Sequence, residues 1–185
     1  MVQRIMIVGQ PGSGKSTLAR ELELRTGLPV VHIDRIHWQA GWIERTREEK
    51  TRLCDEVEAR EAWIFEGGHS ATWPNRLARA EMLIWLDLPI WLRLWRVLRR
   101  SAVYHGVSRP DLPEGCPERI GPETLPFLRW IWNTRHSARA AMGRLQTRAP
   151  AQMPVCHLRS RAEVRRFLRD WPSALGQQGR AGRQG

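Results

Sequence analysis

The sequence predicts an α/β protein in which helices flank a parallel sheet. Short apolar runs that read as buried strands alternate with longer helical segments along the chain. This alternation favours a parallel sheet with right-handed crossover connections. The 185 residues suit one domain, expected over residues 1–172, because a chain of this size can bury a single core. Ligands of such sheets bind at the carboxyl ends of the strands, so the functional residues are expected there.

The expected strands are the apolar runs, and capping residues mark the ends of several expected helices. Gly27 ends the first helix, and Thr46 with Glu49 and Ser160 with Glu163 form capping-box patterns. Strands are expected at residues 4–8, 30–33, 63–65, 82–86 and 155–158. Helices are expected at residues 15–26, 46–60, 89–102, 122–145 and 160–170. The Gly- and Pro-rich residues 104–121 read as a loop, and residues 173–185 read as a disordered tail.

The composition is strongly basic, with a formal net charge of +11. Of the 30 basic residues only Lys15 and Lys50 are lysine, a bias typical of a GC-rich genome that uses Arg for surface cations. The same charge also fits nucleic-acid binding, which is kept as an alternative. In a chain that nearly always uses Arg, a lysine at position 15 indicates that a compact ammonium is needed there.

The sequence favours a cytoplasmic protein without a membrane segment. No apolar run approaches the ~18 residues of a membrane span. A strand begins almost at once, which leaves no room for a signal peptide. Cys54, Cys116 and Cys156 are odd in number and far apart, which argues against a disulfide framework or a zinc site.

A phosphate-binding motif follows the first expected strand. Gly9-Gln10-Pro11-Gly12-Ser13-Gly14-Lys15-Ser16 matches G-x-x-x-x-G-K-[ST] in full, and a helix follows it. Glycines let successive backbone N–H groups point into one cavity, and the helix adds its free N-terminal donors. The lysine reaches the β- and γ-phosphates of ATP, and the serine hydroxyl joins the Mg²⁺ shell. The expected nucleotide-binding residues are Gly9, Pro11, Gly12, Ser13, Gly14, Lys15, Ser16 and Thr17.

Together with this motif, three further stretches resemble the adenylate kinases and related small P-loop kinases. They are His32-Ile33-Asp34, Trp63-Ile64-Phe65-Glu66-Gly67 and Trp85-Leu86-Asp87-Leu88-Pro89. The chain is most similar to a bacterial branch often labelled "DNA topology modulation protein" or AAA-family ATPase. The resemblance implies a three-layer sandwich around a five-stranded parallel sheet. With the strands numbered along the chain, their order is 2-3-1-4-5, and a small lid is expected at about residues 104–121. This chain has Glu66-Gly67 where the branch usually has Asp-Gly, and the next arginine is Arg76, which argues against AMP as the acceptor.

Two carboxylates are candidates for the active site, because each is expected to end a strand beside the motif. Glu66 would hold Mg²⁺ through water together with Ser16, and the alternative is a solvated turn carboxylate. Asp34 would orient an acceptor hydroxyl or take its proton, and the alternative is a helix-capping or turn residue.

The helix expected at residues 89–102 carries arginines on one face. Arg93, Arg96 and Arg100 are spaced by three and four, and five arginines without any acidic residue lie between Leu88 and Pro110. The resemblance implies that Arg96 and Arg100 stabilise the transferring phosphoryl group. Arg135 and Arg139 are candidates for arginines that close over it. The alternative is a solvated basic face.

The ten tryptophans give mixed signals. Trp91 and Trp95 are one helical turn apart and are expected in the core. Trp130 and Trp132 cannot share one buried stripe, so one of them should face the lid, a substrate or a subunit. Trp38 and Trp42 follow Asp34 and would either stack on an acceptor ring or close the loop as a local apolar cluster. His69 reads as a hydrogen-bonded loop residue.

These features favour an ATP- and Mg²⁺-dependent kinase of a small acceptor, such as a nucleotide or a polyol. Its catalytic residues would be Lys15, Asp34, Arg96, Arg100 and Arg135, and its metal-binding residues Ser16 and Glu66. The expected partners are ATP and the acceptor, in a monomer or homodimer that opens its lid without ligand. The alternatives are an ATP-binding, nucleic-acid-associated protein and a regulatory ATPase. The absence of a known nucleic-acid-binding motif favours the kinase.

Overall fold

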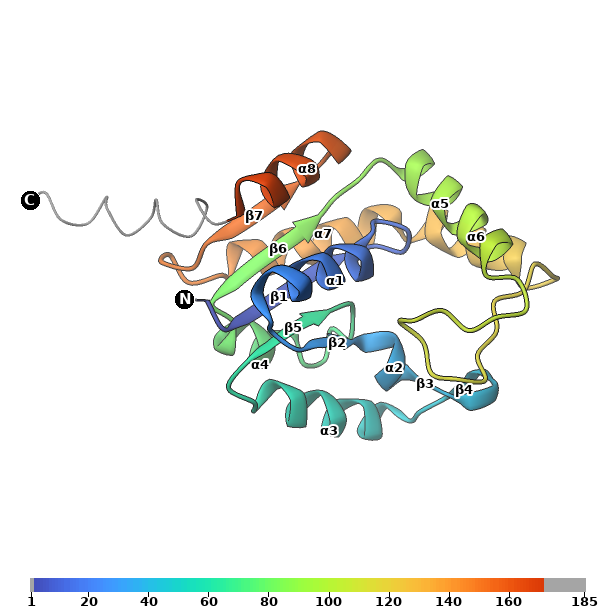
Figure 1. The fold of residues 1–185 in the computed structure, drawn as a ribbon, viewed down its shortest axis with the longest axis horizontal. Helices are drawn as coiled ribbons and strands as arrows, with labels where there is room; N and C mark the ends of the chain where they lie inside the picture. Colours follow the sequence, from blue (N-terminus) through green and yellow to red (C-terminus); the bar gives the residue numbers. More distant parts are fainter. Residues whose placement is uncertain (1, 172–185) are drawn as a thin grey trace, which may run out of the picture.

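The computed structural model describes residues 2–171 and contains the predicted parallel sheet (Figure 1). The strand order is β2-β5-β1-β6-β7, and all four neighbouring pairs are parallel. The strands are β1 (Arg4–Gly9), β2 (Val30–His32), β5 (Trp63–Glu66), β6 (Met82–Leu86) and β7 (Val155–Leu158). The predicted order is therefore confirmed. The expected tail at residues 173–185 lies outside the described residues.

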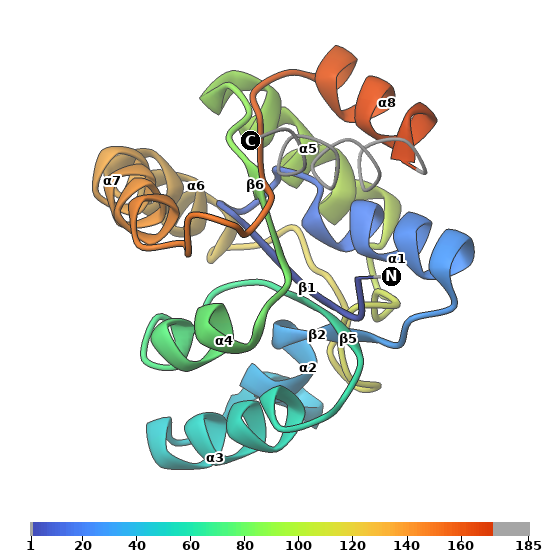
Figure 2. The same cartoon turned by 90° about the vertical axis from the view of Figure 1, so that its left-hand side faces the viewer.

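Helices cover both faces of the sheet, which makes three layers (Figure 2). On one face α1 (Lys15–Thr26) and α8 (Arg161–Arg169) pack on Ile5 and Ile7 of β1. On the other, α3 (Arg47–Glu58), α4 (Trp73–Arg79) and α7 (Arg135–Thr147) belong to the cluster around Met6 and Val8. Successive side chains of β1 thus point into two separate apolar cores, as expected for a strand buried on both faces.

The remaining elements surround the carboxyl end of the sheet. They are α2 (Ile33–His37), β3 (Trp38–Gln39), the 3₁₀ turn η1 (Ala40–Trp42), β4 (Ile43–Glu44), α5 (Ile90–Val103) and α6 (Thr124–Asn133). Strands β3 and β4 form a small antiparallel pair. The sequence did not predict this pair or α4. Asp34 is the second residue of α2, so the prediction that it ends a strand is wrong. None of the helices within residues 2–171 is long and apolar enough to cross a membrane.

The single helix predicted at residues 122–145 is instead two helices, α6 and α7, that meet at Thr134. Two side chains bond the carbonyl groups that would continue the helix. The Thr134 hydroxyl donates to the carbonyl of Trp130 at 2.7 Å, and the Arg135 guanidinium donates to the carbonyl of Trp132 at 2.6 Å. Side chains that bond carbonyls of the preceding turn compete with the helical ladder and bend or break the helix.

The prediction that Trp91 and Trp95 are core residues is also wrong, because they are 69% and 55% exposed. Helix α5 buries Arg93, Val97 and Ser101 instead. The backbone of Arg93 lies against Gly12 of the phosphate loop. The buried face of α5 therefore packs on that loop and not on an apolar core.

Residues 104–121 reach from α5 back to the β3–β4 pair and dock there (Figure 1). The Trp42 indole donates to the carbonyl of Pro117 at 3.1 Å, and the amide of Gly41 donates to the carbonyl of Gly115 at 2.8 Å. Cys116 is fully buried, and isolated bridges join His105 to Glu118 and Ser108 to Pro117. The segment is thus a folded connection in this conformation, and its movement as a lid stays a prediction.

Gly67, which follows β5, is needed for the close approach of α2. Its φ is +110°, and a Cβ atom there would lie 2.0 Å from Cγ2 of Ile33. Both the backbone conformation and the contact exclude a side chain. The neighbouring Gly68 has open space around its Cα.

We expect Gly67→Ala to destabilise the protein by about 1–3 kcal/mol, because α2 must move or the backbone must strain. Gly68→Ala is the matched control and should stay within about 0.5 kcal/mol of the wild type. Urea denaturation of the three proteins measures both effects. Equal stability of the two variants would contradict the contact with Ile33.

Candidate active site

The phosphate loop joins β1 to α1 in a backbone conformation that requires glycine. Gly12 and Gly14 have φ of +76° and +96°, and a Cβ at Gly12 would lie 2.3 Å from the carbonyl oxygen of Arg93. Helix α1 begins at Lys15, so its first amide groups, which lack partners within the helix, belong to the loop. A helix N-terminus preceded by such a loop is a binding site for phosphate.

The hydroxyl of Ser16 contacts carboxylates from two distant parts of the chain. Its oxygen lies 2.9 Å from Oε1 of Glu66 and 3.1 Å from Oδ2 of Asp111. Glu66, which is 1% exposed, is also bonded to Nδ1 of His32 at 2.8 Å. A hydroxyl has one proton and can donate to only one of the two carboxylates at a time. The Ser16 oxygen and both carboxylates therefore form a group of oxygen atoms with more acceptors than donors.

These oxygens fit the ligand preference of Mg²⁺. Magnesium is usually held by one or two carboxylates and the phosphates of a substrate, and it keeps several waters. Within residues 2–171, no three His, Cys, Asp or Glu side chains are placed to hold a metal by themselves. A metal here would therefore depend on Ser16 and on a bound nucleotide as well as on Glu66.

Burial and the charge of Glu66 both change the pKa of Asp34. Burial raises the pKa of Asp34 above its ordinary 3.8, and the negative charge of Glu66 raises it further. Lys15 and Arg109 act in the opposite direction. The contacts that Arg109 makes with Asp34 and Asp111 link Asp34 to the Ser16–Glu66 pair, and the charge of Lys15 also acts on Asp34. A carboxylate whose pKa is raised is a better proton acceptor than an ordinary one.

Arg109 connects Asp34 to two carboxylates of the segment 104–121. It contacts Oδ2 of Asp111 at 2.7 Å, Oε1 of Glu118 at 2.7 Å and Oδ2 of Asp34 at 3.6 Å. Its side chain is 7% exposed. Burial is the largest influence on the pKa of Asp111 and raises it, but Arg109 acts together with hydrogen bonds and His32 to hold the pKa below 3.8. Arg109 is thus the main electrostatic link between the segment and the acceptor side of the site.

Two arginines of α5, Arg93 and Arg96, lie against the phosphate loop, and Arg100 contacts the segment 104–121. The Arg96 guanidinium donates to the carbonyl of Ser13 at 3.0 Å, and the Arg100 guanidinium lies 3.3 Å from Glu118. Arg93 is 4% exposed beneath the loop. The sequence stretch without acidic residues ends one position before Asp111, so carboxylates next in the chain balance Arg100 and Arg109. The lack of acidic residues between Leu88 and Pro110 therefore does not leave Arg100 and Arg109 without a counter-charge.

Arg135 and Arg139 contact other parts of the protein. The Arg135 guanidinium stacks on the Trp132 ring at 4.2 Å. The backbone carbonyl of Arg135 accepts a hydrogen bond from the side-chain amide of Gln10 at 2.8 Å. The Arg139 guanidinium donates to the carboxylate of Asp87 at 2.8 Å, and the same carboxylate is hydrogen-bonded to His157. Arg135 is therefore connected to the phosphate loop through its backbone, and Arg139 is engaged at the end of β6.

The aromatic residues after Asp34 form a local cluster. Trp38 and Trp42 meet edge to face at 5.3 Å, and His37 packs against Trp38. Because the Trp42 indole also bonds Pro117, this cluster holds the segment 104–121. Among the other predicted residues, Pro11 is half-buried in the loop and Thr17 is exposed on α1.

Three residues of the site were not predicted: His32, Asp111 and Glu118. His32 precedes the short helix that carries Asp34. The apolar pattern of the strand that ends at His32 does not predict that the imidazole contacts Glu66. Asp111 and Glu118 flank the Gly- and Pro-rich turn, and two acidic residues immediately after an arginine-rich helix were a usable signal.

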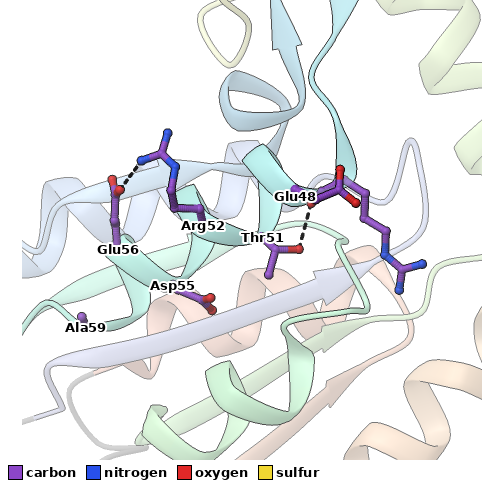
Figure 3. A pocket seen from close by; sticks show the side chains of 7 residues that line it. Glu48, Thr51, Arg52, Asp55, Glu56 and Ala59 are labelled. Carbon is purple, nitrogen blue, oxygen red and sulfur yellow. Dashed lines mark hydrogen bonds and ion pairs between the residues drawn. The ribbon is translucent and has the colours of Figure 1, made fainter.

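The structure also has an open hollow of about 660 Å³ along α3 (Figure 3). Glu48, Thr51, Arg52, Asp55, Glu56 and Ala59 are among the lining residues, and all of them belong to α3 or directly follow it. Because side chains of a single helix line this hollow, it is open and does not enclose a ligand. We therefore assign it no ligand.

Comparison with known proteins agrees with this geometry. Residues 5–102, just over half of the chain, match the family described as "AAA domain". The chain is 31% identical to a cytidylate kinase of Aeropyrum pernix over 112 residues, which cover 53% of this chain and 64% of that one. It is 32% identical to a shikimate kinase of Halorhodospira halophila over 134 residues, which cover 62% and 70%. The match thus spans just under two thirds of the cytidylate kinase.

Among solved structures, the shikimate kinase of Aquifex aeolicus superposes with a TM-score of 0.59. The superposition covers 97% of this chain and 99% of that one at 14% identity, so it demonstrates a shared fold. The chain belongs to the AAA-domain family of P-loop proteins, and its relatives are small-molecule kinases. The resemblance that the motifs suggested is confirmed.

We expect Arg109→Gln to destabilise the protein by about 3–5 kcal/mol, because it leaves buried carboxylates without their cation. Hydrogen exchange in residues 104–121 should become faster than exchange in the central strands. Arg119→Gln, which changes an exposed arginine of the same segment, is the control. Unchanged protection of the segment in Arg109→Gln would show that the aromatic cluster alone holds it.

Proposed function

We propose that this protein is an ATP-dependent phosphotransferase that transfers the γ-phosphoryl group to a small acceptor. The observation that carries the proposal is the meeting of Lys15, the Ser16–Glu66 pair and Asp34 at one edge of the sheet. A phosphate loop alone would equally suit an ATPase. The carboxylate of Asp34, with a pKa raised by burial and by Glu66 and with Arg109 at 3.6 Å, is the part that suits activation of an acceptor.

ATP would bind with its phosphates on the loop, where Lys15 contacts the β- and γ-phosphates. Mg²⁺, held by Ser16 and Glu66, would neutralise charge on those phosphates. Asp34 would orient the attacking oxygen of the acceptor and take its proton. Arg96 and Arg100 would face the phosphates from α5, and the segment 104–121 would act as the lid that excludes water.

The free cysteines support a cytoplasmic location, since Cys54 and Cys116 are buried as thiols in a chain without a predicted disulfide. We further propose a monomer or homodimer whose partners are ATP and the acceptor. The relatives, a cytidylate kinase and a shikimate kinase, support a small-molecule acceptor over nucleic acid.

We predict that Lys15→Ala abolishes ATP turnover and leaves the fold intact. Among residues 2–171, the Lys15 ammonium has no ion pair or hydrogen bond and acts on Asp34 through its charge alone, so its removal should cost little stability. The assay follows ADP release with a panel of nucleoside monophosphates, hydroxy acids and sugars, beside a melting curve. Arg20→Ala on the same helix is the control. Turnover that persists in Lys15→Ala would overturn the proposal.

We also predict that Arg96→Ala and Arg100→Ala lower kcat by about 10³-fold while ATP affinity changes far less. Their charge matters most when the γ-phosphoryl group is in transfer. Arg99→Ala changes an exposed arginine of the same helix, near the Trp95 ring, and should leave kcat within about threefold. Single-turnover kinetics and ATP titration separate the two parameters. A loss confined to ATP affinity would identify a binding role only.

A further inference from the structure

Lys50 is a buried ammonium near the acceptor side of the site. It is one of only two lysines among 30 basic residues, and the other is Lys15 of the phosphate loop. Lys50 lies on α3 and is 8% exposed. A solvated surface cation could equally be arginine in this chain, so a buried lysine indicates a place where a compact ammonium fits and a planar guanidinium does not.

Two histidines lie close to Lys50. Burial is the main cause that lowers the pKa of His37 and of His69, and the charge of Lys50 is the next cause for both. Arg76 and Arg47 lower the pKa of His69 as well. Nε2 of His69 lies 3.0 Å from the Thr51 hydroxyl. His69 thus contacts the residue that follows Lys50 on α3, while His37 shares the carboxylate of Glu44 with Lys50, so the three basic side chains come together from α2, α3 and the loop after β5.

One exposed carboxylate balances this convergence. Oε1 of Glu44 lies 2.6 Å from Nζ of Lys50 and 3.3 Å from Nε2 of His37. The side chain of Glu44 is 54% exposed, whereas that of Lys50 is 10% exposed. Asp34 also acts on His37, and it raises the pKa of that imidazole. A buried cation whose counter-ion is in contact with solvent can exchange that counter-ion for another anion at modest cost.

The cluster is adjacent to the proposed reaction centre. His37 is three residues after Asp34 on α2, so the two side chains are neighbours on that helix. His69 is three residues after Glu66 and follows the Gly67-Gly68 loop. Asp34 and His37 are about one helical turn apart. An acceptor whose hydroxyl is held by Asp34 would therefore reach the cluster with a second group that lies about that distance from the hydroxyl.

We propose that Lys50, His37 and His69 form a subsite for an acidic group of the phosphate acceptor. Glu44 holds the place of that group and is displaced by it. The inference rests on the proposed function and narrows the acceptor to an anionic compound with a phosphate or carboxylate group. An uncharged polyol leaves Lys50 and the two imidazoles to Glu44 and gains nothing from them.

A direct test is the titration of the histidine side chains by NMR, with the phosphate loop saturated by a non-hydrolysable ATP analogue and Mg²⁺. Sodium sulfate and sodium acetate are the probes, at matched ionic strength against chloride. An anion that binds favours the protonated imidazoles, so the pKa of His37 and His69 should rise by about half a unit or more. A rise with sulfate alone indicates a phosphate acceptor, and a rise with acetate alone a carboxylate acceptor.

Three variants make the test specific. Lys50→Met should abolish the rise, and Arg52→Met, which removes an exposed cation of the same helix, should preserve it. Glu44→Gln should tighten sulfate or acetate binding by about threefold or more, because the competing carboxylate is gone. If Lys50→Met does not fold, the double variant His37→Gln/His69→Gln replaces it, with loss of sulfate and acetate binding by calorimetry as the readout.

Kinetics then separates this subsite from the proposed function. With an acceptor from the panel, Lys50→Met should raise the acceptor KM by about tenfold and leave the KM for ATP unchanged. No response of either imidazole to sulfate or acetate would overturn the subsite even in an active kinase. A normal anion response without ATP turnover on any acceptor would instead overturn the kinase assignment and, with it, the identification of the anion as part of an acceptor.

Discussion

The hydroxyl of Ser16 is the point on which the arrangement of the site depends. It belongs to the first turn of α1, and it contacts Glu66 from the end of β5 and Asp111 from the segment 104–121. One proton cannot satisfy two carboxylates, so the three oxygens stay together only because neighbouring cations offset the charge. Arg109 performs that task for Asp111. Asp111 therefore links the segment to the phosphate loop, and a ligand that changed the charge at the loop would also act on the segment.

Local signals were sufficient to predict most of the fold. Helix α1 begins and ends where Lys15 and Gly27 indicated, and Thr46 with Glu49 forms a capping box, because these effects depend on a few neighbouring residues. The strand order followed from the resemblance. The failures share a cause, which is that tertiary contacts outweighed the local pattern. Trp91 and Trp95 have helical spacing but are exposed. Helix α5 instead buries the face that carries Arg93, because the phosphate loop packs there.

The site was predictable where its residues lie in one motif and hidden where they come together only through folding. Lys15, Ser16 and Glu66 were expected from strand ends and the loop. Asp111 and Glu118 were not, because they lie in a Gly- and Pro-rich stretch whose path no local pattern specifies. Lys50 shows a third case. Its rarity was visible in the sequence, but its meaning required knowledge of its burial and of the two histidines beside it.

The contacts of Arg96 and Arg100 on α5 imply different roles for them in the proposed transfer. Among residues 2–171, Arg96 has no carboxylate at ion-pair distance, and it is held by the carbonyl of Ser13 within the loop itself. It is thus oriented in advance for an anion on that loop. Arg100 is instead paired with Glu118 of the segment. For Arg100 to contact a phosphoryl group, the phosphate must compete with Glu118, so the engagement of Arg100 and the proposed movement of the segment would be one event. Such an exchange of partners would link the charge that develops during transfer to closure over the acceptor.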